Sequence, residues 1–294
     1  MAVRDVNHEL QSMTQAEKFR CCLRLLRFRD WSVQSGIFLL GAFFADDLLT
    51  RDADFILSSL TLSCLCLAYG YSLNEFYDDM KERLAGNGQA AGQLIGFIYG
   101  LLALAVAVAW LISPKTFAIV SLIGLTVWLH SAPPLRLKTH LFWRFFLNSL
   151  GFGLFFLAGA SLDNRVTAGE ILMGAFIFGL YLPLELIHVL AHQEADRAKG
   201  LRTFATVHGE RKTTFLTLSL LCGLILYAGA LWQFGFMKTA PTFWTVLNLL
   251  MLLGIVASFG GQNSIEAFGK LRLRAKITCL IFGSGLLMLL AVKI

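Results

Sequence analysis

The chain has 294 residues, of which 56% are hydrophobic and only 15% are charged. A soluble domain carries about 25% charged residues, so this composition excludes an ordinary water-soluble globular protein and predicts an integral membrane protein. The formal net charge of +6 is compatible with nucleic-acid binding, but the placement of the basic residues along the chain explains it in another way.

Nine apolar runs approach or reach the roughly 20 helical residues that cross the hydrocarbon core of a bilayer. They cover residues 31–47, 55–76, 93–112, 115–130, 141–162, 168–190, 213–236, 242–260 and 275–293. Short polar segments separate the runs, and no long linker interrupts them. The sequence therefore predicts an all-α integral membrane protein with about nine transmembrane helices, forming a single domain over residues 1–294.

Lysine and arginine residues gather in the loops that follow the even-numbered runs. The N-terminal segment 1–30 holds six of them and these loops hold fourteen, against five on the other side. Because basic loops stay in the cytoplasm, we expect segment 1–30 and the loops after even-numbered helices to be cytoplasmic. This asymmetry explains the basic charge without a nucleic-acid partner.

The end of the second run carries oxygen-bearing side chains at a spacing of four residues: Asn74, Asp78 and Glu82. On an α-helix this spacing puts the three on one stripe. Mg2+ binds oxygen ligands, usually one or two carboxylates together with substrate phosphates. Acidic groups at membrane depth are costly and indicate function. A solvated helix end is the alternative, and it is our interpretation of Asp79 and Lys81.

The end of the sixth run carries Glu185, His188, His192 and Asp196 at spacings of three, four and four residues. We expect these four side chains to share one helix face. A single buried histidine is usually a core residue, but two histidines and two carboxylates on one stripe predict a site. Gly200 is the predicted stop of this helix.

A third polar segment follows the fourth run. Residues 133–134 are both proline, which predicts the end of that helix, and Arg136 and Lys138 then lie near the membrane, able to pair with phosphate oxygens. The alternative is ordinary positive-inside charge, which is our interpretation of Arg272 and Arg274. Taken together, the three segments predict a magnesium–diphosphate site, in which cations stabilise the charge that develops on a leaving diphosphate.

These motifs resemble those of the UbiA superfamily of intramembrane prenyltransferases. The family's first motif, approximately Asn-x-x-x-Asp-x-x-x-Asp after the second helix, reads here as Asn74 through Glu82. Residues 196–203 fit the latter half of the second motif, and residues 131–138 closely match a signature between the fourth and fifth helices. Residues 24–27 are similar to the segment before the family's first helix. The resemblance covers the whole chain.

Two ligand positions depart from the family's pattern. Glu82 replaces an aspartate, and His192 replaces the first aspartate of the second motif. Imidazole prefers softer metals than Mg2+, so the second metal site is either weakened, built from Glu194 or Glu185, or absent. His192 is then either a degraded metal ligand or a direct contact to diphosphate or acceptor, and we favour the direct contact. The segment 83–89 lacks the Arg-Pro-Leu-like run of the quinone and chlorophyll branches, which leaves the acceptor open.

The resemblance implies a bundle around a central cavity open to the cytoplasm and Mg2+-dependent transfer of a prenyl group. The donor would be a prenyl diphosphate and the acceptor an aromatic or other lipophilic molecule. The implied Mg2+ ligands are Asn74, Asp78, Glu82 and Asp196. The implied diphosphate-binding residues are Arg27, Arg136, Lys138, Lys199 and Arg202. Implied catalytic or substrate-contacting residues are His192, His188, Glu185 and Tyr71, with Phe152, Phe155 and Phe156 as possible aromatic walls beside Tyr71.

Three alternative functions remain open. A UbiA-type terpene cyclase would use the same diphosphate chemistry without an acceptor. A polyprenyl-phosphate-linked transferase would keep the metal and diphosphate but change the acceptor. A transporter would need polar residues at mid-bilayer, whereas here they cluster at the cytoplasmic helix ends, so an enzyme is favoured.

Overall fold

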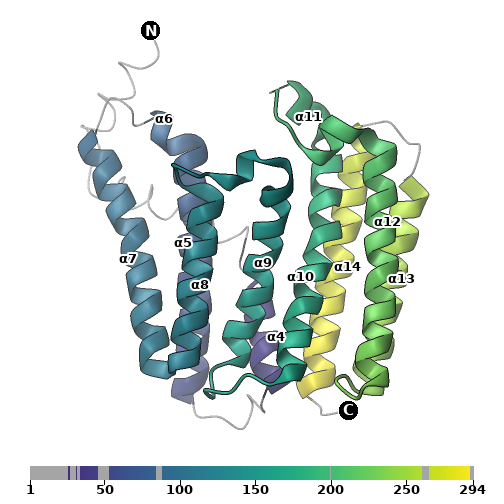
Figure 1. Cartoon of the computed structure of the whole chain (residues 1–294), viewed down its shortest axis with the longest axis horizontal. Helices are drawn as coiled ribbons and strands as arrows, with labels where there is room; N and C mark the ends of the chain where they lie inside the picture. Colours follow the sequence, from purple (N-terminus) through teal and green to yellow (C-terminus); the bar gives the residue numbers. More distant parts are fainter. Residues whose placement is uncertain are drawn as a thin grey trace.

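The computed structural model describes residues 26, 31, 34–45, 53–83, 88–198, 200–259 and 265–291. Every regular element in these residues is a helix (Figure 1). In chain order the elements are α4 (Ser35–Ala45), α5 (Ala53–Glu75), the π-helical turn η3 (Phe76–Met80), α6 (Lys81–Arg83), α7 (Gly88–Ile112), α8 (Pro114–Ser131), the 3-10 turn η4 (Leu137–Thr139), α9 (Leu141–Ala160), α10 (Ala168–Ala191), α11 (Gln193–Ala198), α12 (Phe204–Gln233), α13 (Thr239–Phe259) and α14 (Ile265–Ala291).

Each of the nine predicted apolar runs overlaps one helix of the described residues, namely α4, α5, α7, α8, α9, α10, α12, α13 or α14. Seven of these are long and apolar enough to cross a membrane, and the described part of α4 is a shorter apolar helix. The all-α fold and the multi-pass membrane character are therefore confirmed, while the count of nine crossings stays a prediction. Polar turns precede the apolar runs in both α12 and α14. In α12 these turns are set off from the apolar run by a kink at Gly209, whose φ of +79° and ψ of 166° are not helical.

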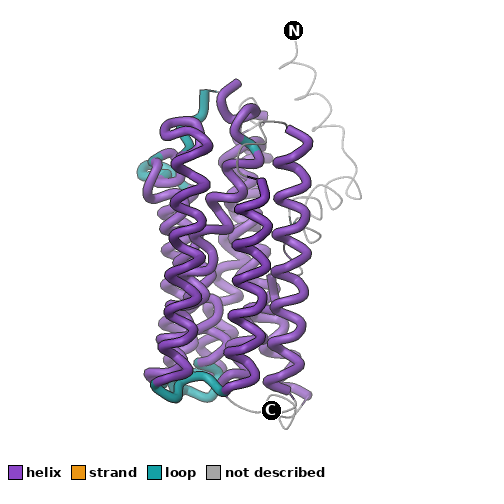
Figure 2. Tube along the Cα trace, turned by 90° about the vertical axis from the view of Figure 1, so that its right-hand side faces the viewer, coloured by secondary structure: helices purple, strands orange, loops and turns teal. Residues whose placement is uncertain are grey.

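The long helices run side by side along a common direction (Figure 2). Neighbours in the chain pack on one another from α5 through α14, and α14 also contacts α4 and α10. One buried cluster joins α10, α12, α13 and α14, and a second joins α4, α5, α7, α8 and α9. Residues of α4 and α9 belong to both clusters, so this helix pair is the seam between two halves of the bundle.

Two glycines let α4 and α9 approach at backbone distance. A Cβ added to Gly41 would lie 2.0 Å from the carbonyl oxygen of Phe156, and one added to Gly159 would lie 1.9 Å from that of Phe38. Two atoms that are not covalently bonded cannot lie so close together, so both positions require glycine, which has no Cβ. Such small residues at helix contacts are typical of membrane bundles, where close packing replaces the hydrophobic driving force.

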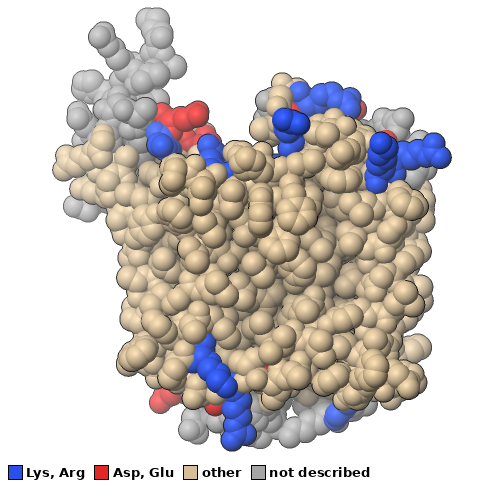
Figure 3. Space-filling model, viewed as in Figure 1, with Lys and Arg blue, Asp and Glu red and all other residues tan. Residues whose placement is uncertain are grey.

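On the face shown in Figure 3, the charged side chains of the described residues occupy the two ends and leave an uncharged belt between them. Helix α6, the loop 132–140 and α11 lie at the same end, the upper end in Figure 1. We call this the polar end. All three sequence motifs therefore reach one end of the bundle, as the loop pattern predicts.

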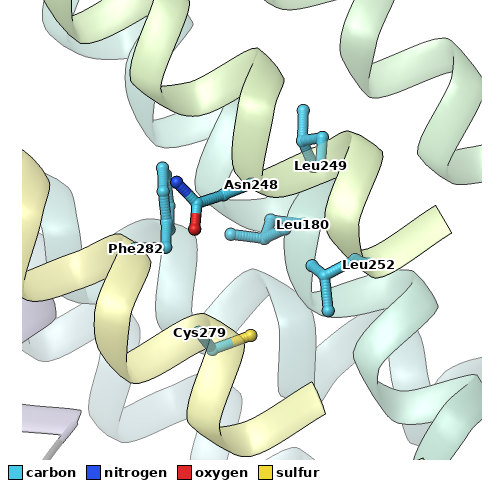
Figure 4. Close-up of a pocket in the computed structure, with 6 residues that line it drawn as sticks. All are labelled: Leu180, Asn248, Leu249, Leu252, Cys279 and Phe282. Atoms are coloured by element: carbon cyan, nitrogen blue, oxygen red, sulfur yellow. The ribbon is translucent and has the colours of Figure 1, made fainter. Parts of the chain in front are cut away.

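A small cavity lies among α10, α13 and α14, away from the polar end (Figure 4). Its lining residues are Leu180, Asn248, Leu249, Leu252, Cys279 and Phe282. The Asn248 amide nitrogen donates to the carbonyl of Trp244 at 2.7 Å, and within the described chain its oxygen has no hydrogen-bond partner. With no charged residue in its lining, this cavity is unsuited to a diphosphate.

The close contact between α4 and α9 can be tested by adding a methyl group to one of its glycines. Gly159→Ala should destabilise the protein by roughly 1–3 kcal/mol, because the new methyl group overpacks a backbone contact. Thermal unfolding of the purified protein would show this as a lower midpoint. The control is Gly223→Ala, since Gly223 has open space around its Cα and a helical alanine is favoured over glycine. Equal midpoints for the two variants would contradict the close contact.

Candidate functional site

The first motif lies where α5 gives way to the π-helical turn η3. The backbone N–H of Lys81 bonds to the carbonyl of Phe76, five residues back. In a regular α-helix, side chains four residues apart are rotated slightly past one full turn, because a turn takes 3.6 residues. The wider π turn reduces this rotation. Asn74 and Asp78 thereby stay aligned on one side. Single π turns are frequent at functional sites.

The oxygens of Asn74 and Asp78 meet at the ammonium group of Lys138. Lys138 Nζ donates to Asn74 Oδ1 at 2.7 Å and to Asp78 Oδ1 at 2.5 Å. Arg136 Nη2 donates to the same Asp78 oxygen and to the carbonyl of Tyr77, each at 3.0 Å. The first motif and the loop between α8 and α9 therefore form one cluster, although the bonded residues are 58 to 64 positions apart in sequence.

The loop that carries the two basic residues has an unusual backbone. Arg136 has φ +37° and ψ +55°, a left-handed conformation that residues other than glycine rarely adopt and that is enriched at functional sites. The helix before it ends at Ser131, just ahead of the two prolines, as predicted. The Arg136 Nε atom is buried and has no hydrogen-bond partner within the described chain.

Lys138 is held in a mostly buried place, with 11% of its side chain exposed. Burial lowers the pKa of the Lys138 ammonium, and this outweighs the opposing effect of Asp78. Ser131 adds a hydroxyl donor to Asn74 Oδ1 at 3.3 Å, and His130 Nδ1 lies 3.2 Å from the Ser131 oxygen. Asn74 therefore accepts from two donors, both from the α8 end and its loop.

The second motif is not one continuous helical stripe. Helix α10 ends at Ala191, His192 has φ −110° and ψ 7°, and α11 then begins at Gln193. The expectation that Asp196 shares a helix face with Glu185, His188 and His192 is therefore wrong. The chain turns at His192, and Gln193 of α11 is tied to α12 by a hydrogen bond to the carbonyl of Ala205.

The turn after α11 follows the sequence prediction. Gly200 has φ +67°, and the Leu201 N–H bonds to the carbonyl of Asp196 at 2.8 Å. This is the left-handed helix stop for which glycine is favoured. Asp196 itself is buried, with 9% of its surface exposed.

The histidines of the second motif meet an arginine from α14. Arg272 Nη1 and His192 Nε2 are 2.6 Å apart, and the rings of His188 and His192 have centroids 4.7 Å apart. A guanidinium can only donate, so the His192 Nε2 atom is the acceptor and carries no proton in this contact. In this contact His192 Nε2 is therefore occupied as an acceptor, and whether His192 is a metal ligand or a direct contact to diphosphate stays a prediction.

Below the histidines, α9 and α10 are joined by two successive side-chain pairs. Glu185 is half-buried and accepts a hydrogen bond from the amide of Asn148. One helical turn further into the bundle, Phe152 stacks on Tyr181 with ring centroids 3.8 Å apart. Tyr71 of α5 lies within electrostatic range of Tyr181. Counted from the polar end, the Glu185 carboxyl group is therefore followed one turn deeper by the stacked rings of Phe152 and Tyr181.

The other aromatic candidates on α9 contact aromatic rings of α4. Phe155 packs against Phe38, and Phe156 packs against Phe44, both on α4. They belong to the seam between the halves. The Tyr71 hydroxyl donates to Gln34 at 2.7 Å, which fixes its ring next to the start of α4.

Arg144, in the first turn of α9, links the two motifs. Its charge acts on His130 and Lys138 beside the first motif, and on Glu185 and His188 in the second. The basic centre of the site thus includes an arginine that loop counting treats as topology charge. Its position inside the first turn of an apolar run was the available signal, since charge at membrane depth indicates function.

The remaining candidates are not brought into these contacts. Glu82 lies exposed on α6, while Arg202 and Glu194 are exposed near α11. Arg27 and Lys199 lie outside the described residues. Within the described chain, no three His, Cys, Asp or Glu side chains converge as a metal site. The acidic centre therefore consists of Asp78 with the amide oxygen of Asn74.

Comparison with solved structures gives matches along nearly the whole chain. A structure described as digeranylgeranylglyceryl phosphate synthase has a TM-score of 0.75 at 15% identity, covering 94% of this chain and 99% of that one. A UbiA homolog from Archaeoglobus fulgidus bound to DMAPP and Mg2+ has a TM-score of 0.72 at 17% identity, covering 91% and 99%. The same homolog bound to GPP and Mg2+ has a TM-score of 0.68 at 16% identity, with the same coverage.

Sequence comparison identifies the family directly. No curated protein matches the chain in a sequence search. The profile of the UbiA prenyltransferase family, however, matches residues 35–278, a range that runs from the start of α4 into α14 and includes both motifs and the loop between α8 and α9. This protein therefore belongs to the UbiA prenyltransferase family.

Proposed function

We propose that the protein is a Mg2+-dependent intramembrane prenyltransferase that uses a prenyl diphosphate donor and an aromatic or other lipophilic acceptor. The observation that carries the proposal is the convergence of Asn74 and Asp78 oxygens on one cationic group, Lys138 Nζ. Family membership supports prenyl transfer. Structural neighbours described as bound to DMAPP or GPP with Mg2+ support the same donor class and metal.

The first motif fits a magnesium ion by its donor chemistry. Asn74 and Asp78 offer oxygen atoms only, and Mg2+ is commonly held by one or two such groups with substrate phosphates completing the shell. The Lys138 ammonium lies between the same two oxygens and marks the place as favourable for a cation. When bound, Mg2+ would supply a Lewis acid that stabilises negative charge on the diphosphate.

The basic residues have a defined task in this proposal. Arg136 and Lys138 both contact Asp78, and both can turn to phosphate oxygens when the carboxylate takes another partner. The unpartnered Nε of Arg136 adds a donor for the same oxygens. As the allylic carbon–oxygen bond breaks, its electron pair leaves with the diphosphate, and these cations hold the charge that develops there.

The carbon cation formed in this step needs a different environment. The stacked rings of Phe152 and Tyr181 lie one turn deeper than Glu185, and aromatic faces attract cations. The acceptor's electron pair forms the new bond to the allylic carbon, and an aromatic acceptor then loses a proton. Glu185, held by Asn148, is our candidate base for that proton.

The orientation and organisation follow the charge distribution. The polar end carries the basic residues of α6, α11 and the starts of α12 and α14, while Lys115, Arg165 and Lys238 lie toward the other end. By the positive-inside rule the polar end would face the cytoplasm. We treat the chain as a single transmembrane domain, with its N-terminal segment on the cytoplasmic side.

Product analysis tests the reaction and separates it from its alternatives. Purified protein in lipid nanodiscs would be given geranyl diphosphate and Mg2+ with an aromatic acceptor, a glycerol-phosphate lipid or no acceptor. The glycerol-phosphate arm is included because a neighbour is described as digeranylgeranylglyceryl phosphate synthase. Prenylated acceptor supports transfer, and cyclised product without acceptor would support a terpene cyclase. Unchanged donor in all arms contradicts an enzyme of this class.

Asp78 is the most direct mutational test of the site. Asp78→Asn keeps the side-chain size but removes the charge that a metal and two basic residues share, so turnover should fall at least about a hundredfold. The control is Asp79→Asn on the same turn. Product formation per folded protein is the measurement, with folding checked by thermal unfolding. A fully active, folded Asp78→Asn protein would refute the assigned role.

Substitution of Lys138 should strengthen metal binding and at the same time lower turnover. Lys138→Met removes the cation that competes for Asn74 and Asp78, so Mn2+, used as a paramagnetic substitute for Mg2+, should bind the ligand-free protein more tightly. The same change removes a diphosphate donor, so turnover should fall. Electron paramagnetic resonance measures the first and product analysis the second. Weaker Mn2+ binding in the variant would contradict the competition.

A further inference from the structure

The two sides of the site hold their cationic groups with different partners. On the side of α5, Arg136 and Lys138 both pair with Asp78, so two cations share one carboxylate. On the side of α10 and α14, Arg272 contacts the imidazole of His192. Within the described part of the chain, Arg272 forms no direct ion pair with a carboxylate, although its charge acts on Glu185 of the same side.

The contact with His192 fixes the guanidinium without cancelling its charge. Arginine has five N–H donors in a rigid fork and no acceptor, and one of these N–H groups bonds to His192 Nε2. An imidazole that accepts on Nε2 is neutral. A carboxylate in its place would bring a negative charge against the arginine, so histidine preserves the cationic character of this side.

This side does not fit a second metal ion. The Nε2 atom of His192 already accepts a hydrogen bond from Arg272, and imidazole is a poor ligand for Mg2+. No third His, Cys, Asp or Glu converges with the two histidines in the described residues. A divalent cation here would also face the charge of Arg272 directly.

We propose that Arg272 is a diphosphate-binding residue and that His192 positions it, so that this side of the site binds phosphate oxygens through a guanidinium without a metal ion. The inference rests on the proposed prenyl diphosphate donor. A planar fork of N–H donors suits phosphate, and such charge-assisted hydrogen bonds are about twice as strong as neutral ones. Arg144, which acts on both motifs, lies between the two sides.

The test uses inorganic pyrophosphate as the probe, because it carries the proposed contact groups without a prenyl chain. Calorimetric titration of the full-length protein in Mg2+ buffer gives the dissociation constant. Arg272→Gln should raise it about tenfold or more, as expected for loss of a hydrogen bond to a charged group. The matched control is Arg274→Gln, since Arg274 lies on the same helix and faces the Phe259 ring.

The positioning role of His192 has its own variants. His192→Gln keeps an oxygen that can accept from Arg272, whereas His192→Leu removes the acceptor. Pyrophosphate affinity should therefore be largely retained in the first variant and reduced in the second. Equal losses in both variants would overturn the positioning role, and thermal unfolding without ligand identifies any variant that has lost its fold.

Metal stoichiometry gives a readout that is independent of turnover. Electron paramagnetic resonance with Mn2+ and pyrophosphate should find one tightly bound ion per chain. Two bound ions per chain, or unchanged pyrophosphate affinity in a folded Arg272→Gln protein, would overturn the inference and leave the prenyl diphosphate donor standing. Failure of the wild-type protein to bind pyrophosphate with Mg2+ would instead overturn the proposed function, and the inference with it.

Discussion

Hydrocarbon cannot solvate charge, and this constraint decides where the protein can do chemistry. A charged side chain at the centre of a bilayer costs several kcal/mol even by the smaller scales, about 2.5–3.5 for Arg, Lys or Asp. On the face drawn in Figure 3, the charged side chains of the described residues accordingly lie at the two ends, with an uncharged belt between them. Asp78, Arg136 and Lys138 all lie at helix ends, and their mutual contacts offset the cost of partial burial.

The polar end is built by local departures from regular helix. The π turn after Glu75 holds Asn74 and Asp78 toward Lys138, and the left-handed backbone at Arg136 turns the loop back onto that helix. At His192 the chain leaves α10 and enters α11. Each departure lies beside a proposed ligand-binding group, which agrees with the general placement of unusual backbone at functional sites.

The sequence predicts the helices well because each one must be apolar for most of its length, and it predicts the first motif because acidic residues at that depth are rare. It does not predict the π turn, because a regular α-helix would give the same four-residue spacing between Asn74 and Asp78. It interprets Arg272 as topology charge and does not single out Arg144, because counting charges by loop gives no information on which side chains an arginine contacts. The partnership of His192 with Arg272 spans 80 residues, beyond any local pattern.

The proposed reaction separates charge along the same axis that the membrane imposes. The diphosphate is an anion and would stay at the polar end with Lys138 and Arg272, while the allylic cation would lie deeper, near the stacked rings of Phe152 and Tyr181. Glu185 lies between these levels, where a proton released by the acceptor can be taken up. Each group of side chains therefore lies at the depth of the charge that it would stabilise: the cations at the polar end with the diphosphate, the aromatic rings deeper with the allylic cation, and Glu185 between them for the released proton.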